Sequence, residues 1–366
     1  MRNVPRFELV HWVVENMATA RYRLGMSEVM GDEDTWAMVD WDPVLEEMEG
    51  GHGRAWPSQR VMEERLPGFL GVPEGEALLT QGTSEANSLV MHLLCGEGTD
   101  VIVDLPAYQP IPELPRLYGS RTVPVTRSMD DGWRLDLQRV QELTGPDTAA
   151  IFTVNLHNPT GAALRREDLR ALADIAADVD ATLVVDEIFR PFVEDDMAVP
   201  PVRQVAPGAI STGSLSKVYV WASTRMGWIS APREAISALD NLKDLVEPSF
   251  ATPGTAAAVR ILDRLPDLRE RARAIARRGM DVMEEWVRSR DDVSWVRPHA
   301  GIICFPRLEG VDDTISLARR AMAEHGVMTS PGELFGLPGH LRIGVGHPDV
   351  GHVREGLRLL GETLDS

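Results

Sequence analysis

Between about residues 77 and 230, short apolar runs alternate with amphipathic segments. The apolar runs are ALLTQ, VIVDL, RTVPV, AAIFTV, TLVVDE, AISTG and MGWISA. Several of them are separated by helical patterns such as SEANSLVMHLLCG and REDLRALADIAADV. Strands separated by helices of this length are typical of an α/β domain with a mostly parallel sheet. Because the runs are continuous, we expect helices to cover both faces of that sheet.

The pattern changes after about residue 246. A long helical stretch, GTAAAVRILDRLPDLRERARAIARRGMDVMEEWVRS, leads into the short runs SWVRP and GIICFPRL, a helix near SLARRAMAEHG, the strand LRIGVG and a final helix. We therefore predict an N-terminal arm (1–45), a large domain (46–245) and a smaller α+β domain (246–366). The arm is rich in Trp and Met without a strand pattern, and is expected to pack against one or both domains.

Composition narrows the classes of partner. Of the 366 residues, 43% are hydrophobic and 25% charged, as in ordinary globular proteins. The formal charge of −19 would repel phosphate backbones and anionic lipid, so neither nucleic acid nor a membrane is expected as a partner. No run reaches the ~20 apolar residues of a membrane span, and the start lacks a signal-peptide pattern. Cys95 and Cys304 lack metal or disulfide spacing. We expect no metal site and a cytoplasmic location.

Polar residues follow four of the predicted strands. They are Gly82, Thr83 and Ser84 after ALLTQ, Asn158 of HNPTG after IFTV, Asp186 at the end of TLVV, and Ser214, Ser216 and Lys217 at the end of AISTG. Open α/β sheets bind ligands at the carboxyl ends of their strands. The sequence therefore predicts one site to which all four segments contribute.

Each of these residues suits a pyridoxal 5'-phosphate (PLP) site, although each has a plainer explanation. A Gly-Thr-Ser turn at a helix start offers N–H groups and hydroxyls to a phosphate, or simply caps the helix. Asp186 is either a structural acid or the anion that keeps a pyridine nitrogen protonated. Asn158 either starts a turn or donates to the cofactor's ring oxygen. Tyr108, in DLPAYQP, is either a loop aromatic or a ring stacked on the pyridine.

Lysines are scarce, which makes the candidate for a covalent bond to such a cofactor easy to choose. The chain contains only Lys217 and Lys243. Lys243 lies in ALDNLKDLVE, which has the pattern of a surface helix. Lys217 stands among apolar and small residues, where we expect its pKa to fall. Lys217 is therefore the better candidate.

Taken in order, the phosphate turn, PAY, NPTG, the acidic pair after a strand, SLSK with Arg225 eight residues later, and LRIG resemble the class I/II aminotransferases of the fold-type I PLP family, over about residues 50–360. The resemblance implies PLP bound covalently to Lys217, which also carries the proton at the substrate's α-carbon. It implies a homodimer. It implies cofactor contacts from Thr83, Ser84, Tyr108, Asn158, Asp186, Phe189, Ser214, Ser216 and Arg225.

Two arginines suit the anions of this chemistry. A guanidinium pairs two oxygens at once, so Arg225 would complete the phosphate site and Arg342 would bind the substrate's α-carboxylate. In a chain this rich in Arg, either residue could instead form a surface ion pair. Arg342 begins a short apolar strand after a Pro-Gly turn, where an exposed Arg is less expected. In the arm, Ser27, beside Met26, is a further candidate for substrate binding.

The sequence departs from the family pattern at two positions. Most relatives have a Tyr hydroxyl that donates to the cofactor's ring oxygen where this chain has Phe189, so that donor is absent. Trp56, in RAWPSQR, replaces the Tyr that usually reaches the phosphate from the neighbouring subunit. Phe189, FPRL and VMTSPGELFG also resemble capreomycidine synthase, a PLP cyclase that acts on hydroxylated arginine.

Three functions remain open on the sequence. The first is an aminotransferase for a free L-amino acid, with a keto acid as acceptor. The second is a β-elimination and cyclisation enzyme for a hydroxylated arginine. The third is a non-catalytic ligand-binding protein with the same fold, and the complete set of catalytic residues argues against it. We predict the first.

Overall fold

A seven-stranded sheet organises the molecule in the computed structural model, which describes residues 4–50, 57–194 and 198–366. The strand order is β2-β8-β7-β6-β5-β3-β4. The strands are β2 (Ala77–Thr80), β3 (Asp100–Leu105), β4 (Arg121–Thr126), β5 (Thr148–Val154), β6 (Thr182–Asp186), β7 (Ile210–Ser214) and β8 (Gly227–Ser230). The strand β8 runs antiparallel to both of its neighbours, β2 and β7, and the other paired strands are parallel. The seven apolar runs are these strands, and the predicted mostly parallel α/β sheet is confirmed.

Successive side chains of the central strands enter two different cores. In β3, Val101 and Val103 join the core that contains α5 (Gly82–Leu94), while Ile102 joins the core that contains α8 (Arg166–Ala177). Alternate residues of a strand point to opposite faces, so both faces of the sheet are buried. This explains why the strands read as continuous apolar runs.

Helices lie between and around the strands of the sheet-bearing part. Its helices are α4 (Pro57–Leu70), α6 (Pro110–Leu117), α7 (Leu137–Leu143), α9 (Val202–Val205) and α10 (Arg233–Val246). The long helical stretch predicted after residue 246 forms two helices, α11 (Thr252–Leu262) and α12 (Leu265–Arg288). Pro266 lies in the first turn of α12, where its missing N–H costs no helical bond, but it cannot continue a helix from α11.

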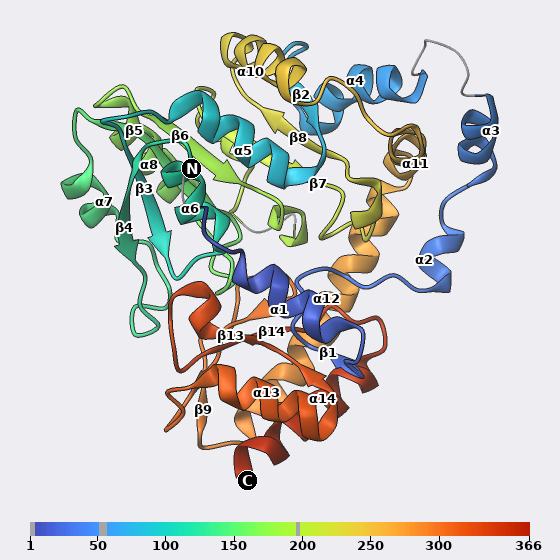
Figure 1. The fold of residues 1–366 in the computed structure, drawn as a ribbon, viewed down its shortest axis with the longest axis vertical. Coiled ribbons are helices and arrows are strands. Elements are labelled where there is room, and N and C mark those ends of the chain that lie inside the picture. Colours follow the sequence, from blue (N-terminus) through green and yellow to red (C-terminus); the bar gives the residue numbers. More distant parts are fainter. Residues whose placement is uncertain (1–3, 51–56, 195–197) are drawn as a thin grey trace.

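The second part of the chain carries short strands and the helices α13 and α14, of which α14 packs against α12 (Figure 1). Its elements are β9 (Val293–Ser294), β10 (Ile303–Cys304), β11 (Arg307–Leu308), α13 (Thr314–His325), β12 (Val327–Met328), β13 (Ser330–Pro331), β14 (Leu341–Gly344) and α14 (Val350–Asp365). The strand β14 lies between β10 and β13 in an antiparallel sheet. The predicted boundary at residue 246 stays a prediction: α11 packs on α4, whereas α12 reaches α14.

The N-terminal arm contacts both parts of the molecule. It contains α1 (Glu8–Met17), β1 (Tyr22–Arg23) and α2 (Glu33–Ala37), while α3 (Asp42–Gly50) crosses the predicted end of the arm at residue 45. The strand β1 pairs in parallel with β12, and Trp12 donates from Nε1 to the Thr329 carbonyl at 2.8 Å. Phe7 lies edge-on to Tyr108 of the sheet-bearing part, with 5.4 Å between ring centroids. The arm therefore bridges the two parts, and Figure 1 shows α1 between the sheet and the C-terminal strands.

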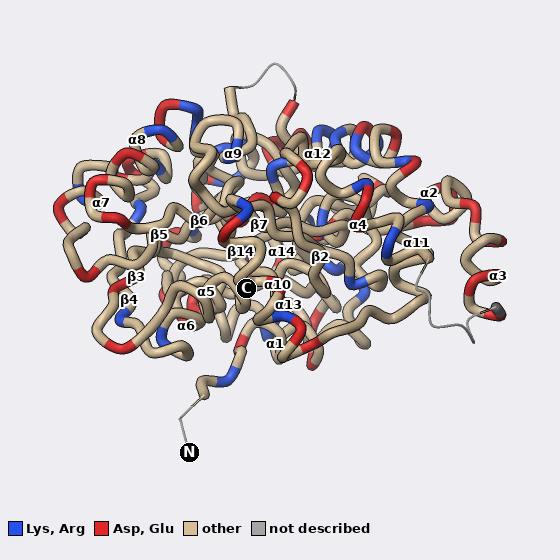
Figure 2. The backbone as a smooth tube through the Cα atoms, turned by 90° about the horizontal axis from the view of Figure 1, so that it is seen from above, with Lys and Arg blue, Asp and Glu red and all other residues tan. Residues whose placement is uncertain are grey.

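Acidic and basic residues are interspersed along the outer helices, as Figure 2 shows for α7, α8 and α12. Many form short-range ion pairs, such as Arg139 with Glu142 and Arg358 with Glu362. Over the described ranges, none of the helices combines the length and apolar character needed to span a bilayer.

Backbone segments pack closely at the start of β8, and a substitution at Gly227 tests this packing. A Cβ on Gly227 of β8 would lie 2.5 Å from the Gly82 carbonyl carbon and 2.9 Å from the Gly213 carbonyl oxygen. Neither atom belongs to a flexible side chain, so Gly227→Ala should lower the free energy of unfolding by roughly 1–3 kcal/mol. A Cβ on Gly208 meets no atom within 4 Å, which makes Gly208→Ala the matched control. Equal urea midpoints for the two variants would show that the backbone here is not closely packed.

Candidate active site

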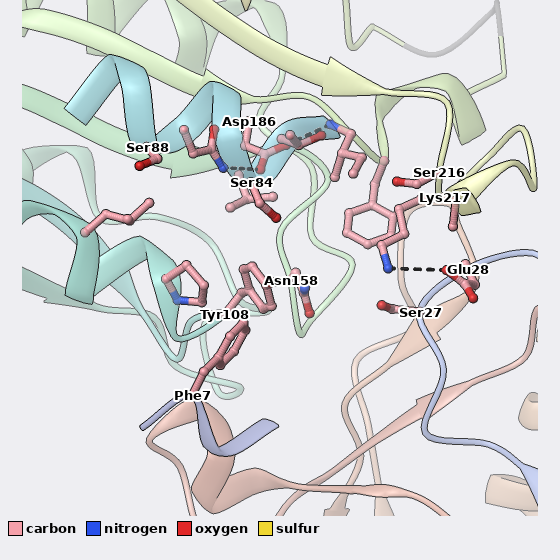
Figure 3. A pocket seen from close by; sticks show the side chains of 18 of the residues that line it. Phe7, Ser27, Glu28, Ser84, Ser88, Tyr108, Asn158, Asp186, Ser216 and Lys217 are labelled. Atoms are coloured by element: carbon pink, nitrogen blue, oxygen red, sulfur yellow. Dashed lines mark hydrogen bonds and ion pairs between the residues drawn. The ribbon is translucent and has the colours of Figure 1, made fainter. Parts of the chain in front are cut away.

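A cavity of about 450 Å³ opens at the carboxyl ends of the sheet strands (Figure 3). Most of the residues that the sequence singled out line it. They are Ser27, Thr83, Ser84, Tyr108, Asn158, Asp186, Phe189, Ser216, Lys217 and Arg225. They come from the arm, the start of α5 and the segments that follow β3, β5, β6 and β7. The site therefore depends on the strands ending at one edge of the sheet.

Two predicted residues lie just behind the cavity wall. Ser214 is buried, and its hydroxyl is 2.7 Å from that of Ser216. Arg342 is 2% exposed and donates from Nη1 to Asn158 Oδ1 at 3.2 Å and from Nη2 to the Gly25 carbonyl at 2.8 Å. Both residues thus contact the cavity's lining directly. The remaining candidate, Trp56, lies outside the described residues.

The start of α5 forms a compact anion-binding turn. Gly82 has φ +79°, and a Cβ there would lie 2.7 Å from Arg225 Nη2, so a glycine lets the guanidinium approach the turn. Arg225 itself has a left-handed φ of +53°. The hydroxyl oxygen of Thr83 is buried without a hydrogen-bond partner among the described residues. An unused hydroxyl, a helix N-terminus and a guanidinium together suit a phosphate dianion.

Asp186 ends β6 as a buried carboxylate with two donors. Its Oδ2 accepts from Asn87 Nδ2 at 2.8 Å, and its Oδ1 accepts from the Ile188 N–H at 3.0 Å. Burial raises the pKa of Asp186 to about 6 although both donors act in the opposite direction. Thr212 of β7 donates to Asn87 Oδ1 at 2.6 Å, which fixes the direction of the amide. Sequence reasoning missed Asn87, whose one signal was a polar residue on the apolar face of its helix.

Asn158 is held by a network beneath the NPTG segment. His157 Nδ1 is 2.8 Å from the Thr160 hydroxyl, and its Nε2 is 3.4 Å from Asp104 Oδ2. Asp104 pairs at 2.6 Å with Arg127 in the interior. Burial lowers the pKa of His157 to about 3, so the ring is neutral in ordinary buffers. The loop that carries Asn158 is therefore anchored on an ion pair whose charge does not change near neutral pH.

Lys217 faces an acidic residue that the sequence analysis did not select. Its Nζ lies 3.7 Å from Glu28 Oε2 (Figure 3). Burial lowers the pKa of Lys217, and Glu28 opposes that shift. Because the arm has no clear periodicity, the only signal for Glu28 was its position beside Ser27.

The prediction that Lys243 lies on a helix surface is wrong. Lys243 is only 4% exposed, since its ammonium donates to the Glu247 carbonyl at 3.0 Å and lies 4.4 Å from the centre of the Phe250 ring. These contacts hold the Lys243 amine outside the cavity. Lys217 is therefore the one lysine of the chain in this pocket.

The sequence matches the family model of aminotransferases class I and II over residues 55–357. The chain belongs to this family. It is 28% identical to capreomycidine synthase of Streptomyces vinaceus over 301 residues, which cover 80% of this chain and 75% of that protein. It is also 28% identical to an arginine–pyruvate transaminase of Pseudomonas aeruginosa over 296 residues, which cover 78% and 75% of the two chains.

Solved structures agree with this assignment to the class I and II aminotransferases. A PLP-dependent aminotransferase from Streptococcus suis superposes with a TM-score of 0.91 at 25% identity, covering 100% of this chain and 98% of that one. Aspartate aminotransferase from Thermus thermophilus, solved with maleate, gives a TM-score of 0.85 at 22% identity over 99% and 100% of the two chains, a likeness of fold alone.

PLP is the cofactor of this member of the class I/II aminotransferase family. The residues present fit it. The free Thr83 hydroxyl and the glycine turn match a phosphate, the buried Asp186 matches a protonated ring nitrogen, and Lys217 supplies an amine. The family assignment thus agrees with the donors and charges found at the edge of the sheet.

The raised pKa of Asp186 predicts that the unfolding free energy of the cofactor-free protein depends on pH. The pKa of Asp186 is 3.8 in the unfolded chain and about 6 in the folded protein. Its contribution to stability is therefore fully present below pH 3.8 and is lost as the pH rises through 6. The unfolding free energy of the wild type should therefore fall by about 3 kcal/mol relative to Asp186→Asn between pH 3.8 and 7. Urea titrations at several pH values measure this difference. A difference that stays constant with pH would contradict the buried, ionising carboxyl.

Proposed function

We propose that this protein is an aminotransferase that takes the amino group from a free L-amino acid and passes it to a keto acid, with PLP held on Lys217. The observation that carries the proposal is the position of Lys217, the one lysine in the cavity, whose amine faces the space between Asp186 and the arm. The family assignment supports the same chemistry.

Residues at three sides of the cavity would hold the cofactor. Thr83, Ser84 and Arg225, with the Ser214–Ser216 hydroxyl pair behind them, would bind the phosphate. Asp186 would place its charge at the ring nitrogen. Tyr108, Asn158 and Phe189 would contact the ring, and the pKa of Tyr108, which burial raises to about 12, keeps its hydroxyl protonated. When bound, PLP supplies an electron-accepting ring that stabilises negative charge at the substrate's α-carbon.

Lys217 and Arg342 would handle the substrate. The lowered pKa of Lys217 increases the share of its amine that is neutral, and a neutral amine at the cavity can accept the α-proton. Burial lowers the pKa of Arg342 to about 10, so the guanidinium is still charged at neutral pH. Its Nε is buried and has no partner in the described part of the chain, which leaves a donor for an α-carboxylate.

One observation favours elimination and cyclisation as a second candidate function. Phe189 is 2% exposed and lines the cavity without a hydroxyl that could donate to the cofactor's ring oxygen. The chain is also 28% identical to capreomycidine synthase. Loss of a β-substituent after α-proton removal, followed by attack of the side chain on the β-carbon, uses the same Lys217 and Asp186.

We propose that the protein acts as a homodimer. Family members are typically oligomeric. The arm also exposes apolar side chains next to the cavity's Ala222 segment, including Trp36 at 57% and Leu45 at 55%. A second copy would cover these side chains.

Incubation of the holoenzyme with single L-amino acids tests the proposed function. We expect at least one amino acid to convert PLP to pyridoxamine phosphate and release its keto acid, and Lys217→Ala to abolish the conversion. Absorbance and mass spectrometry follow both products.

The same incubations separate the two candidates. A cyclic product from a β-hydroxylated arginine without pyridoxamine phosphate would replace the first candidate by the second. The absence of any product from either class of substrate would leave the fold with a binding role alone.

A further inference from the structure

One acidic side chain in the cavity has no role in the proposed function. Four charged side chains line the cavity, namely Glu28, Asp186, Lys217 and Arg225, and Arg342 lies directly behind the wall. Under the proposed function, Arg225 meets the phosphate, Asp186 the ring nitrogen, Arg342 the α-carboxylate and Lys217 the cofactor's carbonyl carbon. Glu28 alone is left without a partner from the cofactor or from the common part of an amino acid.

Backbone contacts fix Glu28 between the lysine and the carboxylate site. The Val29 N–H donates to the Lys217 carbonyl at 3.0 Å, and the Met30 N–H donates to the Gly346 carbonyl at 2.9 Å. At the other end of the segment, the Gly25 carbonyl accepts from Arg342 at 2.8 Å. A substrate held by Arg342 and reacting at Lys217 therefore lies along this segment. Figure 3 shows Glu28 and Ser27 on the arm, opposite Lys217.

The proposed chemistry requires the present partner of Glu28 to lose its positive charge. Glu28 Oε2 lies 3.7 Å from Lys217 Nζ, and the two side chains are 26% and 27% exposed. Among the described residues, this is the one ion pair that Glu28 makes. Under the proposed function, Lys217 has to be neutral to accept the α-proton, and a neutral amine offers Glu28 no positive charge. A half-buried carboxylate that loses its counter-charge is unfavourable unless another cation replaces it.

We propose that Glu28 binds the cationic side chain of the substrate, so that the protein selects basic L-amino acids carrying a guanidinium or an ammonium group. An acidic side chain would meet like charge at Glu28, and a neutral one would leave the carboxylate unpaired. This inference rests on the proposed function, because it takes Arg342 and Lys217 as the groups that hold the rest of the substrate.

L-ornithine and L-norvaline form the matched substrate pair, since they differ only by the terminal ammonium. With the wild-type holoenzyme, L-ornithine and L-arginine should form pyridoxamine phosphate roughly 10- to 100-fold more efficiently than L-norvaline, as expected for one charge-assisted hydrogen bond. Glu28→Gln should bring the ratio close to one, and Glu28→Asp should keep part of it. Glu33→Gln, which neutralises an exposed acid on α2, is the control and should keep the full ratio.

Binding of the α-methyl analogues gives a readout that needs no turnover, because they carry no α-proton. Calorimetry with the holoenzyme should show α-methyl-L-ornithine binding roughly 10- to 100-fold more tightly than α-methyl-L-norvaline, and Glu28→Gln should abolish the difference. Equal affinities in the wild type, or an unchanged preference in Glu28→Gln, would overturn the role of Glu28. If no amino acid forms pyridoxamine phosphate or a cyclic product, the proposed function fails, and the binding comparison still decides the role of Glu28.

Discussion

The parallel register of β6 and β7 is the constraint on which the site depends. It places Asp186 opposite Thr212, and Thr212 orients the Asn87 amide that donates to Asp186. This chain of contacts joins two strands to α5, whose first turn carries Thr83 and Ser84. The ring-nitrogen site and the phosphate site are thus parts of one rigid unit. A shift of one residue in the register would move Asp186 to the other face of the sheet and break both.

Burial shifts the pKa values of the charged groups in and around this unit. Desolvation is the largest cause of the raised pKa of Asp186, of the lowered pKa of Lys217 and of the lowered pKa of Arg342. Each group is thereby moved toward its neutral form and gains from an opposite charge that enters the cavity. A dianionic cofactor with a cationic ring nitrogen, and a substrate with a carboxylate, supply those charges. Glu28, whose Oε2 lies 3.7 Å from Lys217 Nζ, is the acid of the cavity to which we assign a cation from the substrate.

The sequence predicted the parts of the site that follow strands. Continuous apolar runs identified all seven strands of the sheet, and polar residues at their ends identified Asp186, Lys217 and the Gly82–Ser84 turn, because strand ends are a strong local signal. Glu28 and Asn87 were missed for opposite reasons. Glu28 lies in an arm whose path is fixed by backbone bonds to distant residues, and Asn87 looked like a helix residue until the fold placed Asp186 beside it. The burial of Lys243 likewise depends on Phe250, which local periodicity does not reveal.

The central claim is that Lys217 holds the cofactor, and borohydride reduction of the holoenzyme followed by peptide mapping tests it most directly. Reduction makes the bond between a lysine and PLP permanent, so the mass of the cofactor stays on one peptide. We predict that the modified peptide contains Lys217 and that Lys217→Ala shows neither the label nor the visible absorbance of the bound cofactor. A label on Lys243, or an unchanged absorbance in Lys217→Ala, would contradict the account.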